Sequence, residues 1–195
     1  MPSEPIHIVL IKGSVRPGNY TSKALRLVAE ELEQQPRVRV TVVDTEDFAL
    51  VPPGSATDNP GPAKLRELVA GATGVILSTP EYHGSFSSVI KMVIENLGFP
   101  SVLSGKPVGL LGVAAGQIGA IKSLEHLRSV CSHVGAIVLP GPVSVAGVQQ
   151  VFDEDGNCLN EKVEGQVKGL AATLIHYIQR NICPRVALEA MVRDS

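Results

Sequence analysis

Short apolar runs rich in valine, isoleucine and leucine alternate along the chain with longer amphipathic segments. Such runs are typical of strands that are buried on both faces of a parallel sheet, and the amphipathic segments have the period of helices that cover it. The pattern predicts strands at Ile6–Lys12, Val38–Asp44, Val75–Ser78, Val108–Ala114 and Ala136–Leu139. It predicts helices at Thr21–Gln34, Ala63–Ala70, Ser87–Leu97, Ala120–His133 and Glu161–Arg180.

The alternation of strand and helix indicates the topology. Right-handed crossovers place helices on both faces of a five-stranded parallel sheet, which makes an α/β fold of the three-layer α/β/α sandwich type. The commonest strand order for such a sheet is 2-1-3-4-5, and its ligand site lies at the carboxyl ends of the strands. This rule directs attention to the loops after Lys12, Thr79 and Ala114.

Two segments are irregular. The proline-rich stretch Val51–Pro62 predicts a surface excursion after the second strand, because proline disrupts a helix interior. In Pro140–Gly156, alternating valines and the Asp155-Gly156 turn signal indicate a small hairpin before the last helix. We expect one domain over residues 1–195, with tails at 1–5 and from about 184 to 195.

Composition and charge exclude several classes of protein. With 195 residues and 44% hydrophobic content, the chain has the size of one globular domain. A formal net charge of −2 supplies no basic field for a phosphate backbone, so we expect no nucleic-acid partner. The chain has no apolar run of about 18 residues and no signal-peptide pattern at Met1–Pro5, which favours a cytoplasmic protein without a membrane partner.

The cysteines and histidines form no metal-binding motif. Cys131, Cys158 and Cys183 are widely spaced and odd in number, so we expect reduced, structural thiols. The five histidines show no ligand spacing, and we therefore expect no metal site.

The loop Gly13–Ser22 joins the first strand to the first helix and is rich in small polar residues. Hydroxyls, an amide and the Arg16 guanidinium stand in front of the helix N-terminus, an environment that suits a phosphate group. Val15 stands where a dinucleotide loop needs its second glycine, and Asn19-Tyr20 stands where a Walker loop needs lysine and a hydroxyl. Two interpretations of the loop remain. It binds a phosphate group that takes no part in the chemistry, or it only caps the helix and leaves Arg16 solvated.

A second motif, Thr79-Pro80-Glu81-Tyr82 and the residues up to Lys91, follows the third strand. Together with the Gly-Ser-x-Arg loop at Gly13–Arg16, it resembles the NADPH-dependent FMN reductase family of flavodoxin-like oxidoreductases. The family includes quinone, azo-dye and chromate reductases, and the similarity extends from Ile6 to about Arg180.

The resemblance implies a set of FMN-binding residues in three loops. The FMN phosphate would be held by Ser14, Arg16, Asn19, Tyr20 and Thr21. The isoalloxazine and ribityl groups would lie along Pro80, Glu81, Tyr82 and His83, with Ser85 closing that loop. The pyrimidine edge of the flavin would lie against the backbone of Gly116, Gln117, Ile118 and Gly119.

The sequence departs from the commoner form of the second motif, which has asparagine at His83 and Pro-Gly at Ser87-Ser88. Two interpretations of His83 stay open, a proton donor to a reduced quinone and a solvated loop residue. We expect Glu81 to contribute its backbone to the flavin and its carboxylate to a subunit contact. The apolar helix Ser87–Leu97 and the resemblance together imply a homodimer or homotetramer.

The function that follows is an FMN-dependent NAD(P)H oxidoreductase. Electrons would pass from NADPH or NADH through FMN to a small acceptor such as a quinone, free flavin, azo compound or metal oxyanion, with no catalytic side chain required. The alternative functions are a flavin electron carrier without enzymatic activity and a flavin-based redox sensor that acts through a protein partner.

Overall fold

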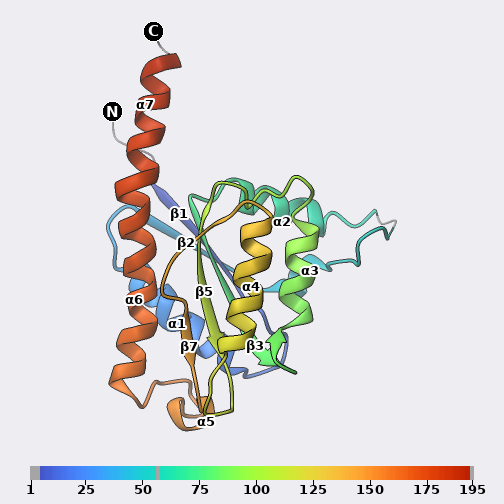
Figure 1. Ribbon diagram of the computed structural model, residues 1–195, viewed down its shortest axis with the longest axis vertical. Coiled ribbons are helices and arrows are strands. Elements are labelled where there is room, and N and C mark those ends of the chain that lie inside the picture. The colour runs from blue at the N-terminus through green and yellow to red at the C-terminus, as the bar shows by residue number, and fades with distance from the viewer. Residues whose placement is uncertain (1–4, 56–57, 194–195) are drawn as a thin grey trace.

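The computed structural model describes residues 5–55 and 58–193, and within them a central sheet lies between two layers of helices (Figure 1). The main strands are β1 (Ile6–Ile11), β2 (Val38–Val43), β3 (Gly74–Tyr82), β5 (Pro107–Val113) and β6 (Ile137–Val138). They are parallel and follow the order β2-β1-β3-β5-β6, which confirms the predicted flavodoxin-like order.

The described part of the sheet has seven strands, so the predicted count of five was wrong. Strand β4 (Ser85–Phe86) pairs antiparallel with the end of β3, and β7 (Val143–Val145) pairs in parallel with β5. Strands β6 and β7 share the fifth position of the sheet and are separated by Leu139–Pro142. The prolines at 140 and 142 have no N–H for a strand ladder, which explains the break between them.

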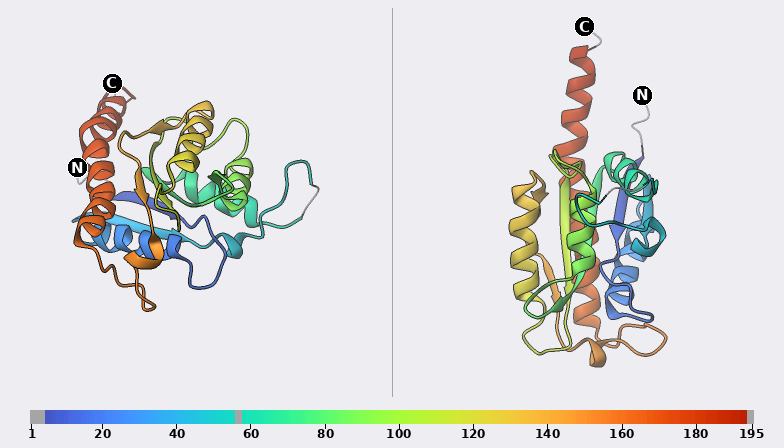
Figure 2. Two further views of the ribbon diagram at one scale, coloured as in Figure 1. Left: turned by 60° about the horizontal axis from the view of Figure 1, so that its bottom comes forward. Right: turned by 90° about the vertical axis from the view of Figure 1, so that its right-hand side faces the viewer.

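Helices cover both faces of the sheet (Figure 2). One face is covered by α1 (Tyr20–Glu33) and α6 (Glu161–Tyr177), the other by α2 (Gly61–Ala70), α3 (Ser88–Asn96) and α4 (Ile121–His133). Each of these lies where the sequence predicts a helix. Two shorter elements, the 3₁₀ turn η1 (Thr45–Phe48) and α5 (Val148–Val151), follow β2 and β7.

The apolar strands follow from this layering. In β1, Ile8 and Leu10 pack into the core beneath α1 and α6, whereas Val9 and Ile11 pack into the core beneath α2, α3 and α4. Successive side chains of a strand point to opposite faces, so a strand covered on both sides needs apolar residues at every position. On α3, the predicted polar pair forms an ion pair between Lys91 and Glu95.

The segment before α6 differs in detail from the predicted hairpin. It contains β7 and α5, and the hairpin is reduced to one antiparallel bridge between Phe152 and Cys158. Asp155-Gly156 does lie at the turn, where Gly156 has a φ of 86°. The described part of the predicted excursion after β2 is irregular up to α2, whose first turn contains the predicted last residue, Pro62, and residues 56 and 57 lie outside the described residues.

The C-terminal segment is helical, which corrects the expectation of a tail from about residue 184. A π-helical turn, η2 (Ile178–Ile182), joins α6 to α7 (Cys183–Arg193). Pro184 suggested an end because it cannot donate a backbone hydrogen bond, but the wider turn, in which Cys183 N–H donates to the Ile178 carbonyl, accommodates it. Residues 1–4, 194 and 195 of the expected tails lie outside the described residues.

Within residues 5–55 and 58–193, no helix is long and apolar enough to cross a membrane. The three cysteines are free thiols, as expected. Cys131 is completely buried in the core beneath α4, and this burial raises the pKa of its thiol to about 12. Cys158 and Cys183 are half-buried.

Alkylation should therefore distinguish the three thiols. In the native protein at pH 8, we expect iodoacetamide to modify Cys158 and Cys183 and to leave Cys131 intact, because only an accessible thiolate reacts. Peptide mass spectrometry with and without denaturant checks this. Alkylation of native Cys131 at the rate of Cys158 would contradict the packing of α4 described above.

Candidate functional site

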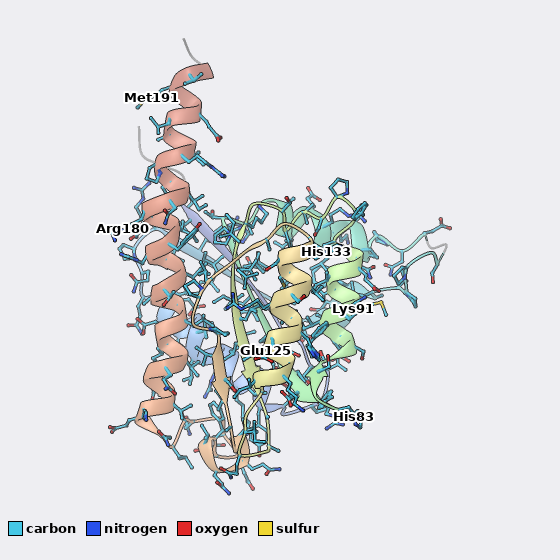
Figure 3. All side chains as sticks on the ribbon, in the orientation of Figure 1. His83, Lys91, Glu125, His133, Arg180 and Met191 are labelled. Carbon is cyan, nitrogen blue, oxygen red and sulfur yellow. The ribbon has the colours of Figure 1, made fainter. Side chains whose placement is uncertain are left out.

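Three loops that the sequence singled out meet at one edge of the sheet. They follow β1, β3 and β5, which are neighbours in the strand order, and parallel strands place their carboxyl ends together. In Figure 1 this edge is at the bottom, where β4, β7 and α5 lie, and His83 marks it in Figure 3. Arg180 and Met191 lie on the far side of the molecule (Figure 3).

The first loop is held tightly against β3. A Cβ atom at Gly13 would collide with the Ser78 carbonyl oxygen, so only glycine permits this approach. Ser87, the N-cap of α3, donates from its Oγ to the Gly13 carbonyl at 2.6 Å. The buried Ser78 Oγ donates to the Ile11 carbonyl at 2.7 Å. These contacts fix where the first loop begins.

The polar side chains of the first loop organise the N-terminus of α1. Asn19 is the N-cap, and its Oδ1 accepts from the Ser22 N–H at 2.8 Å, while its Nδ2 donates to the Arg16 carbonyl at 2.6 Å. Ser14 is only 5% exposed, and its Oγ accepts from the Arg16 N–H at 3.4 Å. Asn19 therefore caps α1, as the simpler of the two interpretations of this loop predicts.

The other two predicted residues of this loop lie in the first turn of α1. Thr21 is buried, and the Tyr20 ring packs against Phe152 with 6.4 Å between ring centroids. Lys23 Nζ lies 5.1 Å from the centroid of the Tyr20 ring. The rigid packing of Tyr20 and Thr21 leaves the exposed backbone and side chains of the loop to face a ligand.

A pocket of about 480 Å³ opens beside this loop. Four cationic side chains line it, together with Asp44, Glu46 and Asp155; the cations are Lys12, Arg16, Lys23 and Arg26. The first turn of α1 carries no acidic residue, so nothing there offsets the positive end of the helix dipole. The pocket combines loop N–H groups, a helix N-terminus and a guanidinium, which is the donor set that a phosphate monoester requires.

Lys12 and Asp44 form an ion pair on the β2 side of the pocket, with 2.8 Å between Nζ and Oδ2. The hydrogen bond from Lys12 holds the pKa of the Asp44 carboxyl below its usual value. The Asp44 carboxyl is therefore ionised at neutral pH and offsets the charge of Lys12. The other cationic side chains of the pocket are Arg16 on the first loop and Lys23 and Arg26 on α1.

Lys23 and Arg26, on the other side of the pocket, hold the turn that follows Phe152. Lys23 Nζ donates to the Asp153 carbonyl at 2.6 Å, and Arg26 Nη2 donates to the Gly156 carbonyl at 2.6 Å. Sequence reasoning missed this role. The available signal was a pair of cations three apart on α1 and a separate turn motif, and nothing in the sequence connects the two segments.

The second loop leaves the sheet at Pro80, which is buried at the end of β3. His83 is exposed and has a left-handed φ of 51°, and Gly84 follows with a φ of 73°. This tight reversal brings Ser85 back to pair with Tyr82, and Ser85 Oγ lies 3.1 Å from His126 Nδ1 on α4. Ser85 thus pairs with Tyr82 and contacts His126, a partner that sequence reasoning missed.

The first and second loops meet through Arg16 and Tyr82. The guanidinium carbon lies 5.0 Å from the centroid of the Tyr82 ring, a cation–π contact. The ring is 37% exposed, so the pair stands at the surface above both loops. A ligand that spans the two loops would lie against these two side chains.

The second and third loops are joined by Glu81. Its Oε2 accepts from the Ser123 N–H, in the first turn of α4, at 3.1 Å. The N-cap of that helix is Ala120, which has no side chain that can cap it. Glu81 thus caps α4 from a distant loop, whereas the sequence analysis assigned its carboxylate to a subunit contact.

The third loop is open at one end and tightly packed at the other. Gly116, Gln117 and Ile118 are exposed, and a Cβ atom at Gly116 would meet nothing within 4 Å. Gly119 is buried with a φ of 78°, and a Cβ atom there would collide with Ser144 Oγ. The same Oγ accepts from the Ala120 N–H at 2.8 Å, a second contact that the sequence did not reveal.

Comparison with known proteins identifies this arrangement. Residues 6–150 match the family model for NADPH-dependent FMN reductase. The chain belongs to that family. The reductase is 26% identical to an NAD(P)H-dependent FMN reductase of Pseudomonas aeruginosa, with 91% of this chain and 98% of the relative covered. It is 29% identical to an NADPH azoreductase of a Bacillus strain, with 87% and 93% covered.

Solved structures agree on the fold of the reductase. The flavoenzyme NAD(P)H:acceptor oxidoreductase FerB of Paracoccus denitrificans superimposes with a TM-score of 0.68 at 22% identity, covering 88% of this chain and 98% of that one. The apo form of an NADH:FMN oxidoreductase gives a TM-score of 0.68 at 17% identity, with 87% and 90% covered. These likenesses confirm the flavodoxin-like fold.

Family membership confirms the central predictions from the sequence: an oxidoreductase, with FMN as cofactor and NADPH as electron donor. It gives no support to the carrier or sensor alternatives. The residues of the reductase fit FMN. The cationic pocket beside the first loop suits the phosphate, and the open space at Gly116 leaves room for a flat ring near the third loop.

The Glu81 cap can be tested by substitution. We expect Glu81→Ala to lower the free energy of unfolding by about 1 kcal/mol, because it removes the acceptor and the negative charge at the α4 N-terminus. Glu81→Gln keeps an oxygen acceptor and should lose less. Urea denaturation without added FMN measures both. Equal stability of all three proteins would show that the cap contributes nothing.

The Lys12–Asp44 pair predicts a pH dependence of stability. A carboxyl whose pKa is lowered on folding stabilises the protein above its unfolded pKa of about 3.9, and the stabilisation is lost as the pH falls through the folded pKa. Wild type should therefore exceed Asp44→Asn in unfolding free energy at pH 6 by less than about 1 kcal/mol, since the pair is partly exposed. The difference should shrink below about pH 4. A difference that persists unchanged at pH 3 would exclude this origin.

Proposed function

We propose that the three loops after β1, β3 and β5 form the FMN site of this reductase and that it transfers electrons from NADPH to small quinone or azo acceptors. The observation that carries the assignment is the contact of Arg16 with Tyr82, which joins the cationic pocket to the second loop. A phosphate in the cationic pocket and a flat ring beside the second loop would then lie on either side of this pair.

In the proposed site, the first loop holds the phosphate through Ser14, Arg16 and Asn19 and the N–H groups at the start of α1, with Tyr20 and Thr21 anchoring that turn. The backbone from Pro80 to His83 lies along the ring and ribityl chain, and Gly116 to Gly119 lie at the pyrimidine edge. Bound FMN supplies the chemistry by accepting hydride from the nicotinamide and passing electrons to the acceptor.

The work of the protein is to position the ring and to stabilise the charge that reduction places on it. Backbone N–H donors at Gly116, Gln117 and Ile118 suit that task, because the loop is closed by the Gly119 N–H, which donates to the Gly116 carbonyl at 3.1 Å, and Gly119 is packed against Ser144. We further propose that His83, which is exposed at the turn of the second loop, gives a proton to a reduced acceptor. We assign no proton transfer to Glu81, whose carboxylate is bonded to α4.

The acceptor class rests on relatives. A 2-hydroxy-1,4-benzoquinone reductase of a Burkholderia strain is 26% identical over 161 residues, and FMN-dependent NADPH-azoreductases of Staphylococcus aureus are 26% identical over 167 residues. Both names describe planar, electron-poor acceptors. We also propose that the reductase is a homodimer or homotetramer, with the half-buried Val89 and Met92 of α3 in a subunit contact.

The first experiment measures FMN and riboflavin binding to wild type and Arg16→Ala by fluorescence quenching. We expect Arg16→Ala to weaken FMN binding on the order of 10- to 100-fold, the value of a charge-assisted hydrogen bond. Riboflavin has no phosphate and should bind both proteins equally. An equal loss for FMN and riboflavin would place Arg16 against the ring and overturn the phosphate assignment.

The matched control is Arg180→Ala, which removes an exposed arginine on the far side of the molecule (Figure 3). It should bind FMN as wild type does. Wild type loaded with FMN should lose its visible absorbance on anaerobic addition of NADPH and regain it on addition of a benzoquinone, over repeated cycles. Reduction without reoxidation by quinone or azo compounds would contradict the proposed acceptors.

A further inference from the structure

Helix α7 carries exposed apolar side chains away from the body of the protein. It extends beyond the sheet at the edge opposite the three loops (Figures 1 and 2). Val186, Leu188 and Met191 are 53%, 64% and 69% exposed. Its first residue, Cys183, packs against the core beneath α1 and α6, and the main contact of α7 with another element is with the turn η2 that precedes it.

The side chains of α7 divide into an apolar face and a charged flank. Pro184, Leu188 and Met191 follow the i, i+4, i+7 spacing and lie on one face of the helix. Arg185 and Glu189 lie beside each other on one flank of that face, with 3.6 Å between Nε and Oε1. The apolar face is contiguous, and Arg185 and Glu189 both lie on the same side of it.

The exposed apolar face of α7 is unfavourable in water. The helix continues α6 through η2 and needs no nucleation of its own, but its exposed apolar area costs about 25 cal/mol per Å² relative to burial. Contiguous exposed apolar faces mark sites of association. The apolar face of α7 therefore requires a partner that covers it.

We propose that the apolar face of α7 packs antiparallel against α7 of a second copy of this chain. A two-fold axis places the same flank of both helices side by side and in opposite directions. Arg185 then lies opposite Glu189 of the partner subunit, and the reciprocal pair forms as well. The two Leu188 side chains meet near the centre, so apolar residues contact apolar residues and each charge faces its opposite.

This charge arrangement favours a second copy over other occupants. Helices that bind lipid surfaces carry several lysines or arginines on their polar side, whereas the flank of α7 sets a carboxylate next to Arg185. The helix also stands clear of the sheet, and antiparallel pairing puts the two protein bodies at opposite ends of the pair (Figure 2). The loops of the FMN site stay open in both copies.

The size of the contact sets its expected strength. A helix of eleven residues is about 16 Å long, and a pair of such faces is smaller than the roughly 1,600 Å² of a standard interface. We therefore expect a dissociation constant in the micromolar range. If the chain also assembles through α3, the α7 contact joins those assemblies in pairs.

The test is sedimentation equilibrium of the full chain loaded with FMN, over roughly 1 to 200 µM, which spans the expected dissociation constant. Wild type should reach twice the mass of Leu188→Glu at the high end. Arg185→Glu and Glu189→Arg should each weaken the association at least about fivefold, since each sets like charges opposite one another. The double variant R185E/E189R restores opposite charges across the pair and should associate as wild type does.

The outcomes separate cleanly. FMN absorbance confirms that each variant is folded, because α7 lies at the edge opposite the site. Equal masses of wild type and Leu188→Glu at every concentration would overturn the proposal, as would failure of the double variant to recover. Flotation of wild type with phosphatidylglycerol vesicles, lost in Leu188→Glu and without any difference in mass, would assign the face to a lipid surface instead.

Discussion

The close approach of the first loop to β3 is the contact on which the rest of the site depends. Because Gly13 has no side chain, the chain can pass directly over the Ser78 carbonyl before it turns into α1. Ser87 then bonds the Gly13 carbonyl and caps α3, so one hydroxyl sets the start of the first loop and the start of α3. The position of Arg16 above the Tyr82 ring follows from this fixed start.

From that point, the loops are linked in series. Arg16 contacts the second loop, Glu81 of the second loop caps α4 after the third, and Ser144 holds the base of the third. The Glu81 and Ser144 links both use backbone N–H groups at the start of α4 that the helix leaves unsatisfied, since its N-cap is alanine. The site is therefore rigid although its surface consists of loops.

Much of this fold was predictable from the sequence, because a strand covered on both faces must be apolar throughout and a parallel sheet needs crossovers. The strands that escaped prediction, β4 and β7, are two and three residues long, too short to show a period. Helix α7 escaped because Pro184 normally marks an end, and a π-helical turn is not encoded in hydrophobic spacing.

The candidate site, like the fold, was predictable from the sequence only in part. The first loop was recognisable because its chemistry is local, with a helix N-terminus, hydroxyls and an arginine within ten residues of Gly13, and the second loop was recognisable from the resemblance of its motif to the family. The bonds between Glu81 and Ser123 and between Ser85 and His126 join residues about forty positions apart. Lys23 reaches a turn 130 positions away. Such pairs follow from the tertiary fold and leave no pattern in one sequence.

The division of the fifth strand position between β6 and β7 has a consequence for solubility. A long edge strand offers a continuous row of free backbone groups to which another chain can add, and here the row is interrupted by Pro140 and Pro142. Arg128 from α4 also donates to the Leu139 carbonyl at 2.8 Å, within the interruption. This edge of the sheet thus presents only two or three residues at a time, which limits the addition of another strand at β6 and β7.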